Sequence, residues 1–95
     1  MSTHDNEYVS NLTFKTPLDE NQNRKLRKEF TGILSSRLRD IRKSKKLTQQ
    51  ELAEKAGLHL TYVGHLELGK YHPTVFVMWK ISKALGVSMN ELTDF

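Results

Sequence analysis

The sequence predicts an all-helical protein, and three observations support that fold class. Apolar residues recur at intervals of three and four through most of residues 33–95, which places them along one face of successive helices. The segments Thr48-Gln49-Gln50-Glu51 and Ser88-Met89-Asn90-Glu91 match the capping box that opens a helix. No segment shows the period-two alternation of a strand bounded by turn residues.

The first 32 residues are predicted to form an extension to the folded domain. Residues 1–16 are polar and show no sustained period, so we expect a disordered or loosely attached tail there. Thr16-Pro17 is a typical helix start, and Leu26 and Phe30 continue an apolar stripe, so a helix is expected over 18–30. Gly32 interrupts that stripe and predicts a break or kink before the next helix.

Residues 33–95 are predicted to form a compact unit of consecutive helices. The expected helices cover about 33–46, 49–56, 60–68 and 74–85, with a short last helix after Ser88. Gly57, Gly69 and Gly86 are their expected stops. The side chains expected to face the core are Leu34, Leu38, Ile41, Leu52, Ala53, Ala56, Val63, Leu66, Val75, Met78, Ile81, Ser82, Leu85 and Leu92.

Composition narrows the function classes. The chain has 15 basic and 11 acidic residues, and the whole excess lies in residues 33–95, which carry ten basic and six acidic residues. The basic side chains gather over 37–46, which is typical either of a polyanion-binding surface or of a solvated helix face. There is no cysteine, which excludes disulfides and thiolate metal sites. Because no basic leader and no run of about 18 apolar residues occurs, we expect a soluble cytoplasmic protein.

The two helices expected over 49–56 and 60–68 carry the chemistry of a helix-turn-helix. In that motif the second helix reaches base edges, while the first crosses the DNA backbone and anchors its N-terminus on phosphate. Gln49 is placed to donate to phosphate beside free backbone N–H groups. Ala53 is small enough for two helices to approach closely, and Gly57 suits the turn between them.

These segments resemble the lambdoid phage repressor and Cro class of helix-turn-helix domains, the Xre-type family. The resemblance covers Leu34 to Leu92, and it is carried by Thr48–Leu58, Thr61–Val63, Leu66–Lys70 and Ile81–Leu92. The segment His59–Val63 further resembles the controller proteins of restriction-modification systems. The resemblance implies a five-helix, repressor-like DNA-binding domain, here with an N-terminal extension.

The resemblance also implies roles for individual positions. The residues expected to face the bases are His59, Leu60, Thr61, Gly64 and His65. The resemblance and the charge pattern together predict phosphate contacts from Arg42, Lys43, Lys46, Gln49, Tyr62, Lys70 and Thr74. The backbone from Thr74 to Phe76 is expected to contribute as well. Arg42 and Glu67 occupy positions that form an internal ion pair in several relatives.

Three positions depart from the pattern that the resemblance leads us to expect. Leu60 and Leu68 stand where arginine is usual, so Leu60 cannot form a bidentate contact with guanine but can contact a thymine methyl group. Gly64 lies inside a helix, where glycine costs about 1 kcal/mol relative to alanine. Readout of DNA shape is an alternative source of specificity.

Phe76 and Trp79 lie beside the inward face of the helix over 74–85. They either complete the core or, with Met89 and Phe95, form a homodimer interface. The sequence thus predicts a transcriptional regulator that binds a pseudo-palindromic operator as a homodimer, with RNA polymerase as a further partner. The alternative is a protein-interaction module on the same fold. The histidines lack the partners of a metal site and no motif places a catalytic base, so we expect neither an enzyme nor a cofactor.

Overall fold

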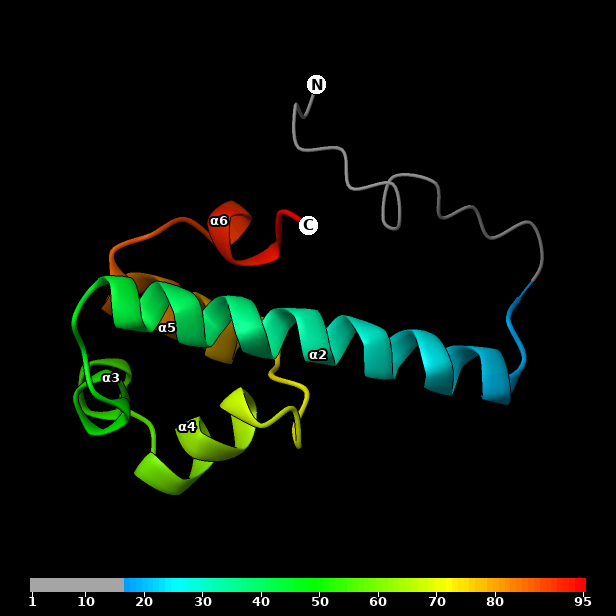
Figure 1. Ribbon diagram of the computed structural model, residues 1–95, viewed down its shortest axis with the longest axis horizontal. Coiled ribbons are helices and arrows are strands. Elements are labelled where there is room, and N and C mark those ends of the chain that lie inside the picture. The colour runs from blue at the N-terminus through cyan, green and yellow to red at the C-terminus, as the bar shows by residue number, and fades with distance from the viewer. Residues whose placement is uncertain (1–16) are drawn as a thin grey trace.

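The computed structural model describes residues 17–95, and within that range it is all-helical, as predicted. The helices are α2 (Glu20–Ser44), α3 (Gln49–Ala56), α4 (Leu60–Glu67), α5 (Val75–Leu85) and α6 (Met89–Thr93). The long α2 runs through the middle of the molecule, with α3 and α4 on one side and α6 on the other (Figure 1). The tail predicted over 1–16, with the expected cap Thr16, lies outside the described residues.

Helix α2 corrects two expectations about the N-terminal region. It begins after Asp19, whose side chain accepts from the Gln22 backbone N–H at 2.7 Å, rather than at Thr16-Pro17. It then continues without a break through Gly32, so the predicted kink is wrong. Thr31, Leu34 and Ser35 are buried around that glycine, and their packing outweighs the roughly 1 kcal/mol that a helical glycine costs.

The first three turns of α2 extend beyond the remaining helices (Figure 1). Almost every residue over 20–30 is exposed, and only Leu26 is half-buried. Packing against other elements becomes close from Thr31 onward. The helix over 18–30 and the helix over 33–46 that the sequence predicts are therefore one continuous element.

The core lies where α2, α3, α4 and α5 meet, and α6 closes it. Leu52 and Val63 are fully buried, and they pack with Leu38, Ile81 and Leu92. One expected core residue, Val75, is 74% exposed instead. It shares a helix face with the buried Ser82, two turns away, but it lies at the start of α5, where the next residue, Phe76, is exposed as well. Val77, one turn before Ile81, packs against the core in its place.

The residues between the end of α2 and the start of α3 set the direction in which the chain enters the helix-turn-helix. Lys46, just after α2, has the left-handed conformation at φ 59°, which glycine more often supplies. Thr48 then opens α3 by accepting from the Glu51 N–H at 3.0 Å, while the Glu51 carboxylate accepts from the Thr48 N–H at 2.8 Å.

In the described part of the chain, no helix is both long and apolar enough to span a bilayer.

Candidate DNA interface

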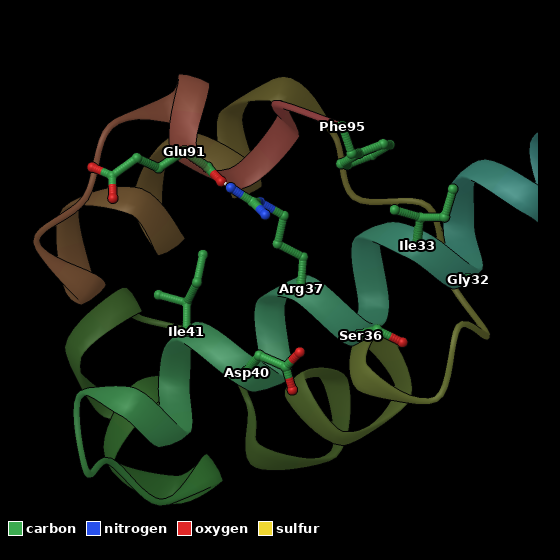
Figure 2. Close-up of a pocket in the computed structure, with 8 residues that line it drawn as sticks. All are labelled: Gly32, Ile33, Ser36, Arg37, Asp40, Ile41, Glu91 and Phe95. Atoms are coloured by element: carbon green, nitrogen blue, oxygen red, sulfur yellow. The ribbon is translucent and has the colours of Figure 1, made fainter. Parts of the chain in front are cut away.

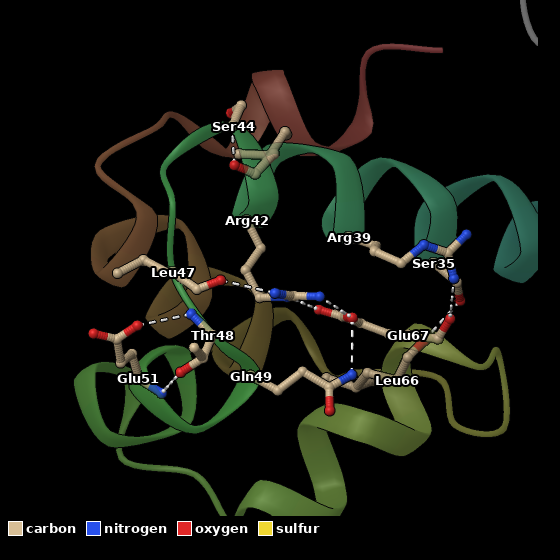
Figure 3. Close-up of polar contacts among 11 residues, drawn as sticks. Ser35, Arg39, Arg42, Ser44, Leu47, Thr48, Gln49, Glu51, Leu66 and Glu67 are labelled. Atoms are coloured by element: carbon tan, nitrogen blue, oxygen red, sulfur yellow. Dashed lines mark hydrogen bonds and ion pairs between the residues drawn. The ribbon is translucent and has the colours of Figure 1, made fainter.

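A buried ion pair joins α2 to the C-terminal end of α4. Arg42 Nε donates to Glu67 Oε2 at 2.6 Å and Arg42 Nη2 donates to Glu67 Oε1 at 2.9 Å. The third guanidinium nitrogen, Nη1, donates to the Leu47 carbonyl at 2.7 Å. Gln49 Nε2 also donates to Glu67 Oε1, at 3.0 Å. Figure 3 shows these contacts converging on the Glu67 carboxylate, which fixes α4 against α2 and the start of α3.

The burial of this pair corrects one predicted phosphate contact. Arg42 is 8% exposed and Glu67 is 3% exposed, so the Arg42 guanidinium lies in the interior and cannot reach DNA. A bidentate arginine–carboxylate geometry of this kind is specific and fully hydrogen-bonded. Arg42 is therefore a structural residue, and the internal pair that the resemblance implies is present.

Burial also leaves only part of the basic cluster predicted over 37–46 exposed to solvent. Arg37 is half-buried and donates to the Glu91 carbonyl, and Arg39 is half-buried and donates to the Glu67 carbonyl at 3.3 Å. The basic side chains of this stretch that stay exposed are Lys43, Lys45 and Lys46. The solvent-facing charge therefore gathers at the C-terminal end of α2, next to the start of α3.

The turn between α3 and α4 has the geometry that a helix-turn-helix requires. Gly57 has φ 67°, a left-handed conformation that a residue with a Cβ rarely adopts. The Leu58 N–H donates to the Ala53 carbonyl at 2.8 Å, which closes the end of α3. Ala53 and Val63 are buried where the two helices pack. The N-terminal end of α4 is thereby held in a fixed direction.

That end of α4 presents its first residues to solvent. His59 and Thr61 are exposed, and Leu60 is 47% exposed. His59 precedes the helix without capping it by a side-chain hydrogen bond, so within residues 17–95 the first backbone N–H groups of α4 keep no acceptor. Gly64 and His65, one turn on, are half-buried. The predicted base-facing residues thus lie on α4 or, for His59, directly before it, and the first turn of α4 is the most accessible part.

Tyr71 belongs to this surface although the sequence did not single it out. Its ring stacks on Tyr62 at 5.6 Å between centroids and meets His65 edge-on at 5.1 Å. The contacts limit how far His65 can turn outward. Burial raises the pKa of the Tyr62 phenol, and the neighbouring Tyr71 adds to the effect. The Tyr62 hydroxyl therefore remains a hydrogen-bond donor at neutral pH.

The other predicted phosphate contacts lie at the ends of helices. Lys70 is exposed in the loop after α4, and Thr74 caps α5 by accepting from the Val77 N–H at 3.1 Å. Among the described residues, no acceptor contacts the N–H groups of Val75 and Phe76 in that first turn. Gln49 is half-buried, and since one of its amide hydrogens bonds Glu67, the other remains for a second acceptor.

The sequence and the fold both match known proteins. The helix-turn-helix family model HTH_3 matches residues 38–92, more than half of the chain. The chain belongs to this helix-turn-helix family. Control protein C.BamHI of Bacillus amyloliquefaciens is 39% identical over 64 residues, 66% of this chain and 79% of that protein. The uncharacterized HTH-type transcriptional regulator y4dJ of Sinorhizobium fredii is 37% identical over 64 residues, 67% of this chain and 83% of the relative.

A solved structure shares the fold. The restriction-modification controller protein C.AhdI from Aeromonas hydrophila superposes with a TM-score of 0.64 at 34% identity, covering 65% of this chain and 94% of that chain. The resemblance to Xre-type domains and to controller proteins is therefore confirmed. The chain is a transcriptional regulator of helix-turn-helix type, from a family of DNA-binding regulators and not of enzymes.

The apolar residues that the sequence assigned to a dimer contact in this helix-turn-helix chain fall into two places. Phe76 is 63% exposed and Trp79 is 48% exposed; their rings stack on each other at 6.4 Å, so they do not complete the core. Phe95 is half-buried and packs on Phe30 of α2 at 5.5 Å. Within residues 17–95, no ring contact links the two pairs. Met89 is half-buried at the start of α6.

Phe95 lies at one end of a groove between α2 and α6. The groove has a volume of about 510 Å³. Figure 2 shows Arg37 reaching across it to the Glu91 backbone, with Phe95 and Ile33 at its far end. The Arg37 bond ties α6 to α2. The residues that line the groove are Gly32, Ile33, Ser36, Arg37, Asp40, Ile41, Glu91 and Phe95.

Proposed function

We propose that this regulator binds a pseudo-palindromic operator as a homodimer and regulates transcription by blocking or contacting RNA polymerase. The observation that carries the proposal is the rigid presentation of α4. Its first turn is exposed, its C-terminal end is pinned by the buried Arg42–Glu67 pair, and Gly57 fixes its angle to α3. A helix held in this way enters a major groove without further ordering.

The base-facing residues of the proposed complex are His59, Leu60 and Thr61, followed by Gly64 and His65 one turn on. The Thr61 hydroxyl can donate to or accept from a base edge, and the exposed Leu60 side chain suits a thymine methyl group. Gly64 adds no side chain, so DNA can approach the backbone of α4 closely there. The half-buried His65, held by Tyr71, contacts a base only with its outer ring edge.

The proposed phosphate contacts surround that helix. Lys43 and Lys46 supply exposed charge at the end of α2, and Lys70 supplies it after α4. Gln49, Tyr62 and Thr74 contribute donors at fixed positions, with the open N–H groups at the start of α3 and α5. Charge of this kind gives affinity for any DNA sequence, whereas α4 gives the choice among sequences.

Dimer formation follows from the small size of this surface. One short recognition helix and a few phosphate contacts give little affinity at physiological salt. Two domains with recognition helices about 34–36 Å apart would meet the same face of DNA. The exposed Phe76–Trp79 pair on α5 is the strongest candidate for the contact, with Met89 and Phe95 on the side of α6 contributing.

Selection of bound duplexes from a random pool tests the operator, and sedimentation tests the assembly. The variant Phe76→Glu/Trp79→Glu is expected to sediment as a monomer and to lose most operator affinity while keeping its helicity. Leu68→Glu is the control for sedimentation, because Leu68 is also apolar and 68% exposed but lies outside the proposed dimer contact. A variant that remains dimeric would place the interface elsewhere, with the groove beside Phe95 as the next candidate.

A protein-interaction module on the same fold is the second candidate function. The observation that favours it is the cationic aromatic surface of α5, where Lys80 lies 5.2 Å from the Phe76 ring centre and Lys83 lies 5.5 Å from that of Trp79. Such a surface suits an acidic, apolar protein partner. Gel-shift titrations with random DNA at low and high salt distinguish the two candidate functions. DNA binding that weakens steeply with salt supports the regulator, and no shift at low salt supports the module.

A further inference from the structure

A basic pocket lies between the N-terminal half of α2 and the loop that follows α4. Its volume is about 240 Å³. The residues that line it are Arg24, Arg27, Lys28, Thr31, Gly69 and His72. The four from α2 stand at i, i+3, i+4 and i+7, which places them on one face of the helix. This face lies outside residues 38–92, the range that the family model covers.

The floor of the pocket is fixed by contacts between distant parts of the chain. Gly69 has φ 76°, and a Cβ there would lie 3.4 Å from Ser35 Oγ, so the glycine lets the loop approach α2. The Thr31 hydroxyl donates its one hydrogen to the Arg27 carbonyl at 2.7 Å. The Thr31 hydroxyl oxygen also lies 2.7 Å from His72 Nδ1, so His72 Nδ1 must be the donor in that second contact. The His72 ring is thereby held in place, and its Nε2 keeps no partner within residues 17–95.

Among the described residues, the cations of the pocket have few counter-charges. Neither Arg27 nor Lys28 has an ion-pair partner within 17–95. Arg24 has Glu20 at 3.9 Å, but the two side chains are 66% and 91% exposed, so water screens that pair strongly. Three cationic side chains around one cavity suit a phosphate group.

We propose that this pocket binds a backbone phosphate of DNA next to the site read by α4. The inference rests on the proposed DNA-binding function and extends it beyond the matched family domain. The pocket borders the recognition helix: His72 follows Tyr71, whose ring meets His65 of α4. The protruding half of α2 then has a role, because it supplies a phosphate contact that the matched domain lacks.

Single substitutions in the full-length chain test the proposal, with fluorescence anisotropy on a labelled random-sequence duplex at several salt concentrations. Because the pocket takes one phosphate, Arg27→Gln and Lys28→Gln are each expected to lower the slope of log K against log salt by up to about 0.9. Between 50 and 200 mM salt, wild type then loses up to about 3.5-fold more affinity than either variant. Lys25→Gln removes the same charge from an exposed residue of the same helix that does not line the pocket, and it should leave the slope unchanged.

The outcomes separate this inference from the proposed function. Wild type that binds no DNA at low salt defeats the proposed function itself. If wild type binds DNA normally and all three variants lower the slope equally, the slope reflects diffuse charge along the helix, and the proposed phosphate pocket is overturned. A slope that none of the variants changes also overturns it. Titration with inorganic phosphate, followed by NMR of the Gly69 and His72 amides, tests whether the pocket binds free phosphate instead of a DNA phosphate. Saturable shifts that Arg27→Gln removes, with DNA binding unaffected, would show a free-phosphate site in place of a DNA contact.

Discussion

The buried Arg42–Glu67 pair gives the sharpest test of how α4 is held. In Glu67→Gln the carboxylate is lost, and the Arg42 guanidinium, 8% exposed, keeps only the Leu47 carbonyl as a fully matched acceptor. An amide at position 67 can still accept one of the two guanidinium bonds, but its NH₂ group faces a donor. Removing one partner of a buried pair costs about 3–5 kcal/mol. With one bond kept, we expect about 3 kcal/mol, or about 12–24 °C in melting temperature for a domain of this size.

The assay is urea and thermal unfolding followed by circular dichroism, with two comparison variants. Glu20→Gln breaks the exposed Arg24–Glu20 pair, whose side chains are 66% and 91% exposed, and it should cost less than about 1 kcal/mol. Replacing both Arg42 and Glu67 by methionine leaves no buried charge, so the double variant should be more stable than Glu67→Gln. The reasoning fails if Glu67→Gln melts as the Glu20→Gln control does.

Three further outcomes are expected. Lys43→Ala should lower the salt slope of binding by about 1 on specific and random DNA alike; an unchanged slope would show that the end of α2 points away from DNA. Thr61→Ala should cost about 1–3 kcal/mol at particular operator positions, and an equal loss on random DNA in the same anisotropy titration would argue against base reading. Glu51 has a pKa held below its ordinary 4.5 by hydrogen bonds from the Thr48 backbone and side chain. Its stabilisation is therefore complete above pH 4.5 and lost as pH falls through the lowered pKa. Glu51→Gln should thus weaken the acid sensitivity of unfolding between neutral pH and about pH 3, and an unchanged pH profile would exclude that contribution.

The features that could be predicted from the sequence are those set by neighbouring residues. A capping box needs only Thr48 and the three residues after it, and a left-handed stop needs only Gly57, so the bounds of α3 followed directly. The apolar spacing likewise identified Leu52, Val63 and Ile81 as core residues. These signals are independent of the rest of the fold.

The features that escaped prediction depend on contacts between distant segments. The break expected at Gly32 did not occur because Thr31 and Ser35 are packed against the loop and end of α4. Charge counting treated the arginines over 37–46 alike, although Arg42 is buried and only the lysines stay exposed. The pocket at Arg27 and His72 joins segments more than forty residues apart, and no pattern in either segment points to the other.

Gly64 tests whether α4 is shaped for DNA or only for folding. A Cβ added there would lie 3.7 Å from Gln49 Oε1, an ordinary contact, so the fold itself does not require glycine at this position. Alanine should therefore stabilise the isolated protein by about 1 kcal/mol, because glycine is the poorer helix former.

If DNA approaches the α4 backbone closely at that point, the same methyl group should weaken operator binding while unfolding shows the gain in stability. The two measurements are made on one Gly64→Ala sample, by urea unfolding and by anisotropy with the selected operator. Gly32→Ala is the matched control: it is also a helical glycine, with open space around a Cβ, and it should add stability and leave binding alone. A Gly64→Ala protein that gains stability and binds its operator as tightly as wild type would show that this face of α4 does not closely approach DNA.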